Sequence, residues 1–207
     1  MVDDVVQPNQ LRDWLTQLHG LGPDRAGRDS AIVKMRSIGS ERLFPILGGF
    51  LKDPDSEFRC LVSEAIFRID PLAGVALLLP LLDDPEWVVR VEICGLLHDI
   101  GDKRTVQPLI QIMKTDPDPM VRNTAAYALG GVGDPVAIPA LIEVLANDHE
   151  CDELGHSASG CAATALDNIL QTNHTRIKFA DGLCTMQPQQ LDLELLKAEA
   201  MELYRNL

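Results

Sequence analysis

The segment Asn147 to Cys161, which reads NDHECDELGHSASGC, carries the side chains best suited to metal chemistry. His149, Cys151, His156 and Cys161 form the pattern H-x-C-x4-H-x4-C, and two imidazoles with two thiols could complete a tetrahedral zinc site. This spacing matches no standard zinc signature. Cys161 also falls on the apolar stripe of a predicted helix. We therefore expect a long polar loop here, with no metal and no other cofactor bound.

Other residues that could do chemistry are fewer and more scattered. Cys94 and His98 lie four residues apart on one predicted helix, but two ligands are too few for a zinc site, so we expect packing or surface roles for them. The chain has no G-x-S-x-G, no P-loop and no G-x-G-x-x-G that opens a βαβ unit. No catalytic residue is therefore assigned.

Composition excludes several classes of partner. The chain of 207 residues has a formal net charge of −13, which repels nucleic acid backbones and anionic membranes. The first ten residues are acidic and do not resemble a signal peptide, and the apolar run from Val75 to Leu82 is too short to cross a bilayer. Five cysteines without paired spacing indicate reduced thiols. We expect a cytoplasmic protein that binds neither nucleic acid nor membranes.

The elements that position these residues come from an internal repeat. An Asp-Pro pair, an arginine and a second aspartate each recur at steps of 31 or 32 residues, a period typical of stacked-repeat proteins. The three sets are Asp53-Pro54, Asp84-Pro85 and Asp116-Pro117; Arg59, Arg90 and Arg122; and Asp70, Asp102 and Asp134.

Each repeat predicts a helical hairpin. Val121, Ala125, Ala128, Leu129 and Val132 are spaced as one face of an α-helix, and two earlier copies keep the same spacing. We expect the Asp-Pro pair to cap this first helix (helix A). A glycine then ends helix A, and the aspartate that follows opens a second helix (helix B).

Degenerate copies extend the pattern in both directions. We predict a single all-α domain over residues 1–207, built as a solenoid of about five hairpins. Residues 1–22 form an N-terminal cap helix, residues 23–170 the repeats, and residues 171–207 a linker and a C-terminal cap helix. Atypical end units are expected because they cover the open ends of the core.

The consensus D-P-x-x-x-V-R-x-x-A-A-x-A-L-G-x-x-G-D-P-x-A-x-P-A-L-x-x-x-L resembles a HEAT repeat, and is similar to the short HEAT-like repeats of the phycobilisome (bilin) lyases. The resemblance implies a right-handed superhelix whose helices B line the concave side. It also implies a ladder between neighbouring repeats, in which Asp70, Asp102 and Asp134 pair with Arg59, Arg90 and Arg122. One relative, an iron-dependent hydroxylase, uses several His-Glu pairs, whereas this chain has only His149-Glu150.

Two functions remain open at this stage. The first is a non-catalytic interaction module, scaffold or assembly factor that binds a protein on the concave face. The partner-binding residues would be Arg104, Gln107, Gln111, Lys114 and Glu143, together with Ala137. Trp87, in the first turn of a helix A, would be an anchor for the partner or a staple onto the preceding repeat. The alternative is a bilin lyase subunit or another chromophore-handling protein.

Overall fold

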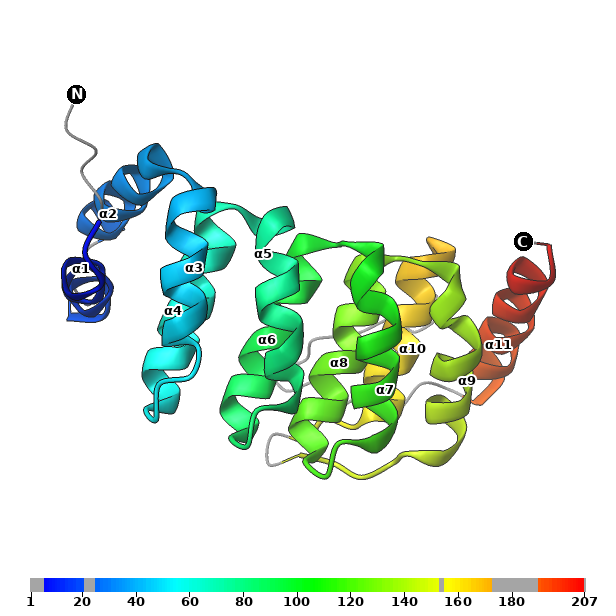
Figure 1. Cartoon of the computed structure of the whole chain (residues 1–207). Helices are drawn as coiled ribbons and strands as arrows, with labels where there is room; N and C mark the ends of the chain where they lie inside the picture. Colours follow the sequence, from blue (N-terminus) through cyan, green and yellow to red (C-terminus); the bar gives the residue numbers. More distant parts are fainter. Residues whose placement is uncertain (1–5, 21–24, 153–154, 173–189, 207) are drawn as a thin grey trace. The chain divides into compact units, whose positions relative to one another are not determined.

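The computed structural model describes residues 6–20, 25–152, 155–172 and 190–206. These residues fold almost entirely into helices (Figure 1), and the predicted α-solenoid is confirmed. No helix among them is long and apolar enough to cross a membrane. The chain divides into two compact units, residues 1–81 and residues 82–207, and each is described by itself. The single-domain assignment stays a prediction.

The first unit contains the cap helix and two hairpins. Its helices are α1 (Pro8–Gly20), α2 (Arg25–Ile38), α3 (Ser40–Phe50), α4 (Ser56–Ile69) and α5 (Pro71–Leu78), followed by the 3-10 helix η1 (Leu79–Asp83). Helix α4 contacts the four other α-helices of this unit, which are α1, α2, α3 and α5. Leu11 and Leu15 of α1 are fully buried, as a cap helix requires.

The second unit contains the clearest repeats. Its helices A are α6 (Trp87–Ile100), α8 (Pro119–Val132) and α10 (Ala158–Leu170). Its helices B are α7 (Val106–Thr115) and α9 (Ile138–Asn147), preceded by the 3-10 turns η2 (Lys103–Thr105) and η3 (Pro135–Ala137). Helix α8 packs between α6 and α10, and α7 contacts α9, so the A and B helices form two layers (Figure 1). Helix α11 (Gln190–Arg205) packs on α9 and α10.

The predicted apolar stripes form the core. Val121, Ala125, Ala128 and Leu129 are fully buried, and Val132 at the end of the stripe is half-buried. The A helices approach closely because small residues face one another. A Cβ atom added at Gly130 would lie 2.7 Å from the Cα atom of Ala165, so this contact between α8 and α10 requires glycine.

The elbow between the helices of a hairpin follows the predicted chemistry. Gly133 ends α8 with a φ of 69°, in the left-handed region that favours glycine. The Asp134 carboxylate then accepts a hydrogen bond from the backbone N–H of Val136, 3.0 Å away. The cap is therefore present, but it closes a 3-10 turn, and the α-helix begins only at Ile138.

The prediction that the Asp-Pro pairs cap the A helices was wrong by two residues. The carboxylate of Asp116 accepts from the backbone N–H of Asp118, and Asp118 itself caps α8 by accepting from Met120. Asp84 makes the same short turn with Glu86. An aspartate that bonds the amide two residues ahead forms a compact turn, so each Asp-Pro pair lies before the helix that follows.

Candidate functional site

A ridge of polar side chains runs along the B layer of the second unit. Arg104, Gln107, Gln111 and Lys114 are all exposed, and their spacing of 0, 3, 7 and 10 residues keeps them on one side of η2 and α7. Glu143, on the neighbouring helix α9, is exposed as well. We call these five residues the B-face ridge.

Ion pairs join the ridge to its neighbours. The Lys114 ammonium lies 2.7 Å from a Glu143 carboxylate oxygen, which links α7 to α9. The Arg104 guanidinium holds the Asp102 carboxylate at 2.6 Å and lowers the pKa of that carboxyl group. Lys103, next to the ridge, bonds Asp134 of the following repeat at 3.2 Å.

Of the two remaining candidates for the binding surface, Ala137 is not exposed, and Trp87 lies on a helix A as expected. Ala137 is fully buried because it is the last residue of η3, where the chain turns into α9. Trp87 begins α6 and so belongs to the A layer, with 43% of its surface exposed, beside the exposed Val88. The role of Trp87 as an anchor stays a prediction.

The arginine ladder exists, but with other carboxylates than the resemblance implied. Arg90 and Arg122 do not pair with Asp102 or Asp134. Arg90 forms a two-pronged contact with Asp116, with N–O distances of 2.7 and 2.9 Å. This contact raises the pKa of the Arg90 guanidinium.

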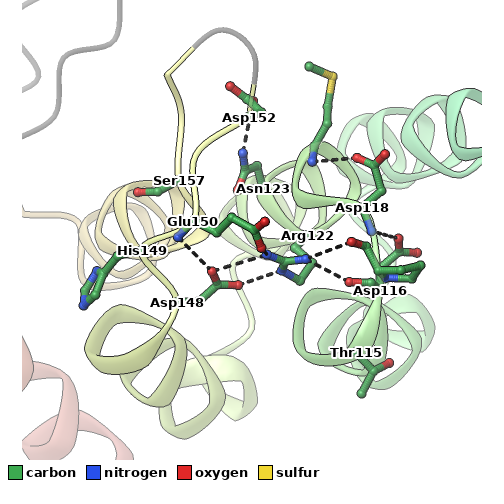
Figure 2. A network of polar contacts seen from close by, with 12 residues as sticks. Thr115, Asp116, Asp118, Arg122, Asn123, Asp148, His149, Glu150, Asp152 and Ser157 are labelled. Carbon is green, nitrogen blue, oxygen red and sulfur yellow. Dashed lines mark hydrogen bonds and ion pairs between the residues drawn. The ribbon is translucent and has the colours of Figure 1, made fainter.

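Arg122 has two acidic partners. Its guanidinium bonds Asp148 at 2.7 Å and Glu150 at 2.6 Å, and it also donates to the backbone carbonyl of Asp116 (Figure 2). Arg59 in the first unit makes the equivalent backbone contact to the carbonyl of Asp53. Each arginine thus bonds a backbone carbonyl just before its own helix A. Arg90 and Arg122 also pair with a carboxylate in the turn before the next helix A.

The described residues on either side of positions 153–154, which are 148–152 and 155–157, are held on α8. Asn123, 4% exposed, donates both amide hydrogens, one to the Asp152 carboxylate and one to the backbone carbonyl of His156. Cys151 and Ser157 form an isolated β-bridge. At the place of the repeat arginine, Ser159 donates its hydroxyl to the carbonyl of Leu145.

The four candidate metal ligands do not form a cluster. Among the described residues, no three His, Cys, Asp or Glu side chains are grouped so that they could hold a metal ion. Cys151 is exposed, and Cys161 lies within α10. The Nδ1 atom of the His156 ring lies 3.4 Å from the Asp152 carboxylate. The expectation of no bound metal itself stays a prediction.

Cys94 and His98 lie in different environments. Cys94 is fully buried, and burial raises the pKa of its thiol to about 12, which suppresses the reactive thiolate. The His98 ring stacks on Tyr127 of α8 with the ring centroids 4.5 Å apart. A side chain at Gly131 would overlap the His98 ring, so the glycine makes room for this stack.

Residues 75–158 match the family model of HEAT repeats. This part of the chain is thus similar to HEAT repeats. Such repeats generally mediate protein–protein interaction. No curated protein matches the chain.

Two crystal structures of engineered proteins, both targets of the Northeast Structural Genomics Consortium, also match. One is 17% identical with a TM-score of 0.48, and the match covers 94% of this chain and 97% of that one. The other is 18% identical with a TM-score of 0.52, and covers 96% of this chain and 60% of that one. At this identity the second likeness shows the helical-repeat fold alone. A link from these HEAT repeats to the bilin lyases stays a prediction.

Several residues that shape this unit were not among the predicted site residues. Asp148 continues the Asp-Pro series one step beyond Asp116, 32 residues on, and that step was a usable signal. Glu150 follows Asp148 by two residues, as Asp118 follows Asp116 and Glu86 follows Asp84, so the period signalled this acid as well. Asn123 had no such signal, because Val91 stands at its place in the preceding repeat.

Proposed function

We propose that this protein is a non-catalytic binding module that holds a protein partner on the B-face ridge of its second unit. The observation that supports the proposal is the ridge itself: exposed polar side chains at helical spacing on α7, tied to α9 by the Lys114–Glu143 pair. A row of side chains on a stacked-helix scaffold offers an extended surface at little cost in ordering, because the repeats hold each helix in place.

Site-specific cross-linking tests this proposal. A photoactivatable residue replaces Gln111 on the ridge or, as a matched control, Tyr127 on the A layer, which is similarly exposed. The partner captured from the native cell extract should cross-link at Gln111 and not at Tyr127. Cross-linking of the same partner only at Tyr127 would move the binding surface to the A layer and refute the proposal.

The bilin-handling alternative has its own test. Free bilin absorbs broadly, and a protein that orders the chromophore sharpens and shifts the visible band. The interaction-module proposal expects an unchanged spectrum when bilin is mixed with the protein at equimolar concentration. A shifted and intensified band would favour the lyase-like function instead.

A further inference from the structure

The exposed cations of residues 82–172 gather at and beside the B-face ridge, whereas the rest of this stretch is strongly acidic. Residues 82–172 contain fifteen Asp and Glu and five Lys and Arg, counted directly along the sequence. Two of the cations, Arg90 and Arg122, are buried in the ladder at 8% exposure each. The remaining three cations, Lys103, Arg104 and Lys114, all lie on η2 and α7 and are all exposed.

The carboxylates that pair with these cations are mostly withdrawn from solvent. The side chains of Asp102 and Asp134 are 14% and 12% exposed, because both cap the elbow turns. Their cationic partners stand outward, with side chains 58% exposed at Arg104 and 78% exposed at Lys103. A partner that approaches the ridge therefore meets cations first. The exception is Glu143, 56% exposed, beside Lys114.

The cations occupy the two ends of the ridge and the amides its middle. Ten residues separate Arg104 from Lys114, which corresponds to about 15 Å along a helix. An extended peptide advances about 3.3 Å per residue, and side chains four residues apart lie on the same side. Two acidic side chains at positions i and i+4 thus match the two ends, and the amides of Gln107 and Gln111 can both donate to and accept from the intervening peptide backbone.

We propose that the B-face ridge recognises an extended acidic segment of a protein partner, with two carboxylates about four residues apart. This inference rests on the proposed function and adds the chemistry of the partner. Glu143 is then a competitor: it occupies Lys114 in the free protein, and the ligand carboxylate replaces it. Exchange is feasible because exposed ion pairs contribute little stability.

The competing role of Glu143 gives a test whose sign is informative. Removing Glu143 should tighten an acidic ligand, whereas it should weaken a basic one. The probes are twelve-residue Gly/Ser peptides that carry two Glu residues at i and i+4, the same two residues adjacent, or Gln in place of both. Dissociation constants come from NMR titrations of the full chain, followed at the side-chain amides of Gln107 and Gln111.

The i, i+4 peptide should perturb both glutamine amides and bind at least about fivefold tighter than either comparison peptide. Glu143→Gln should tighten it about threefold, and Lys114→Gln should weaken it by a similar factor. Glu194→Gln is the matched control: it removes one acid from the surface pair with Lys197 on α11 and changes net charge equally, so the dissociation constant should stay unchanged.

Other results would overturn the inference. Weaker binding after Glu143→Gln, equal binding of all three peptides, or no shift at Gln107 and Gln111 would each do so. Equal tightening by Glu194→Gln would reduce the effect to bulk charge, and equally tight binding of a single-stranded oligonucleotide would reduce it to attraction of any polyanion. If cross-linking at Gln111 still captures a protein in these cases, the interaction module stands and only the acidic ligand is refuted.

Discussion

Removing the acidic partner should cost more stability at Arg90 than at Arg122, although the two ion pairs occupy equivalent places in the repeat. Arg90 forms its ion pair with Asp116, and these side chains are 10% and 3% exposed. Asp118 and Asp84 act on the Arg90 guanidinium only as weaker electrostatic influences. Asp116→Asn leaves a buried guanidinium without its charge partner and should cost about 3 kcal/mol, at the lower end of values for broken buried pairs.

The same change at the next rung should cost less. Asp148 is 21% exposed, and Glu150 bonds the same Arg122 guanidinium at 2.6 Å and remains after the substitution. We expect Asp148→Asn to cost about 1 kcal/mol, the usual value for one partly exposed polar contact. The double variant Asp148→Asn/Glu150→Gln should approach the cost of Asp116→Asn, because both acidic partners are then gone.

Urea denaturation followed by circular dichroism measures these differences, since urea, unlike guanidinium, does not screen charges. The free energy of unfolding from the linear extrapolation should rank Asp116→Asn below Asp148→Asn by about 2 kcal/mol. The nearby control Asp118→Asn keeps a side-chain oxygen for the cap on Met120 and should be almost neutral. Equal losses at Asp116 and Asp148 would refute the reasoning that Glu150 shares the load.

The other predictions concern the core, the elbow, the thiols and the polar loop. Leu129→Ala should lower the free energy of unfolding by about 2–5 kcal/mol because Leu129 is fully buried; a loss under 1 kcal/mol in urea melts would contradict this packing. Asp134→Ala should cost about 1 kcal/mol at neutral pH. The Val136 amide and then Lys103 lower the pKa of the Asp134 carboxyl group below 3.8 in the fold. The stabilisation by Asp134 is therefore complete above the unfolded pKa and is lost as pH falls through the lower folded pKa. The difference in melting between the wild type and Asp134→Ala should accordingly disappear in acid. A thiol reagent should modify the exposed Cys151 in the native protein and reach the buried Cys94 only on unfolding; equal rates would argue against the placement of α6. Elemental analysis of untagged protein should find no zinc, and a chelator should leave the melting point unchanged.

The repeat period predicted the helices well but could not predict the ladder. Helix A shows its buried face in sequence, because burial of Val121, Ala125 and Leu129 requires apolar residues at helical spacing. The step from Asp116 to Asp148 marks Asp148 as a repeat position but does not single it out as the partner of Arg122. Both series of aspartates repeat with the same step as the arginines, so periodicity gives the same score to Asp134 and Asp148. Only three-dimensional packing brings Asp148 to the guanidinium.

The B-face ridge was predictable for a related reason. Gln107 and Gln111 were assigned to the surface because they fall off the apolar stripe, and both are exposed. Ala137 failed the same rule because the first turn of helix B is a 3-10 helix. Its three-residue period rotates side chains differently from the α-helix assumed in the assignment, and alanine is small enough to be accepted on either side.

The long turn after α9 has a consequence for protein engineering. Arg122 meets Asp148 at 26 residues' separation, the same as Arg90 and Asp116, and the additional residues follow Asp148. The extra residues thus lie after the ion pair of Arg122 with Asp148, and the packing of α8 on α10 is retained. Foreign peptide could be grafted at the corresponding point between Asp116 and Asp118, which keeps Asp116 on Arg90 and leaves Asp118 in place as the cap of α8. The turn that follows each arginine–aspartate ion pair is then the position at which this scaffold accepts a new loop.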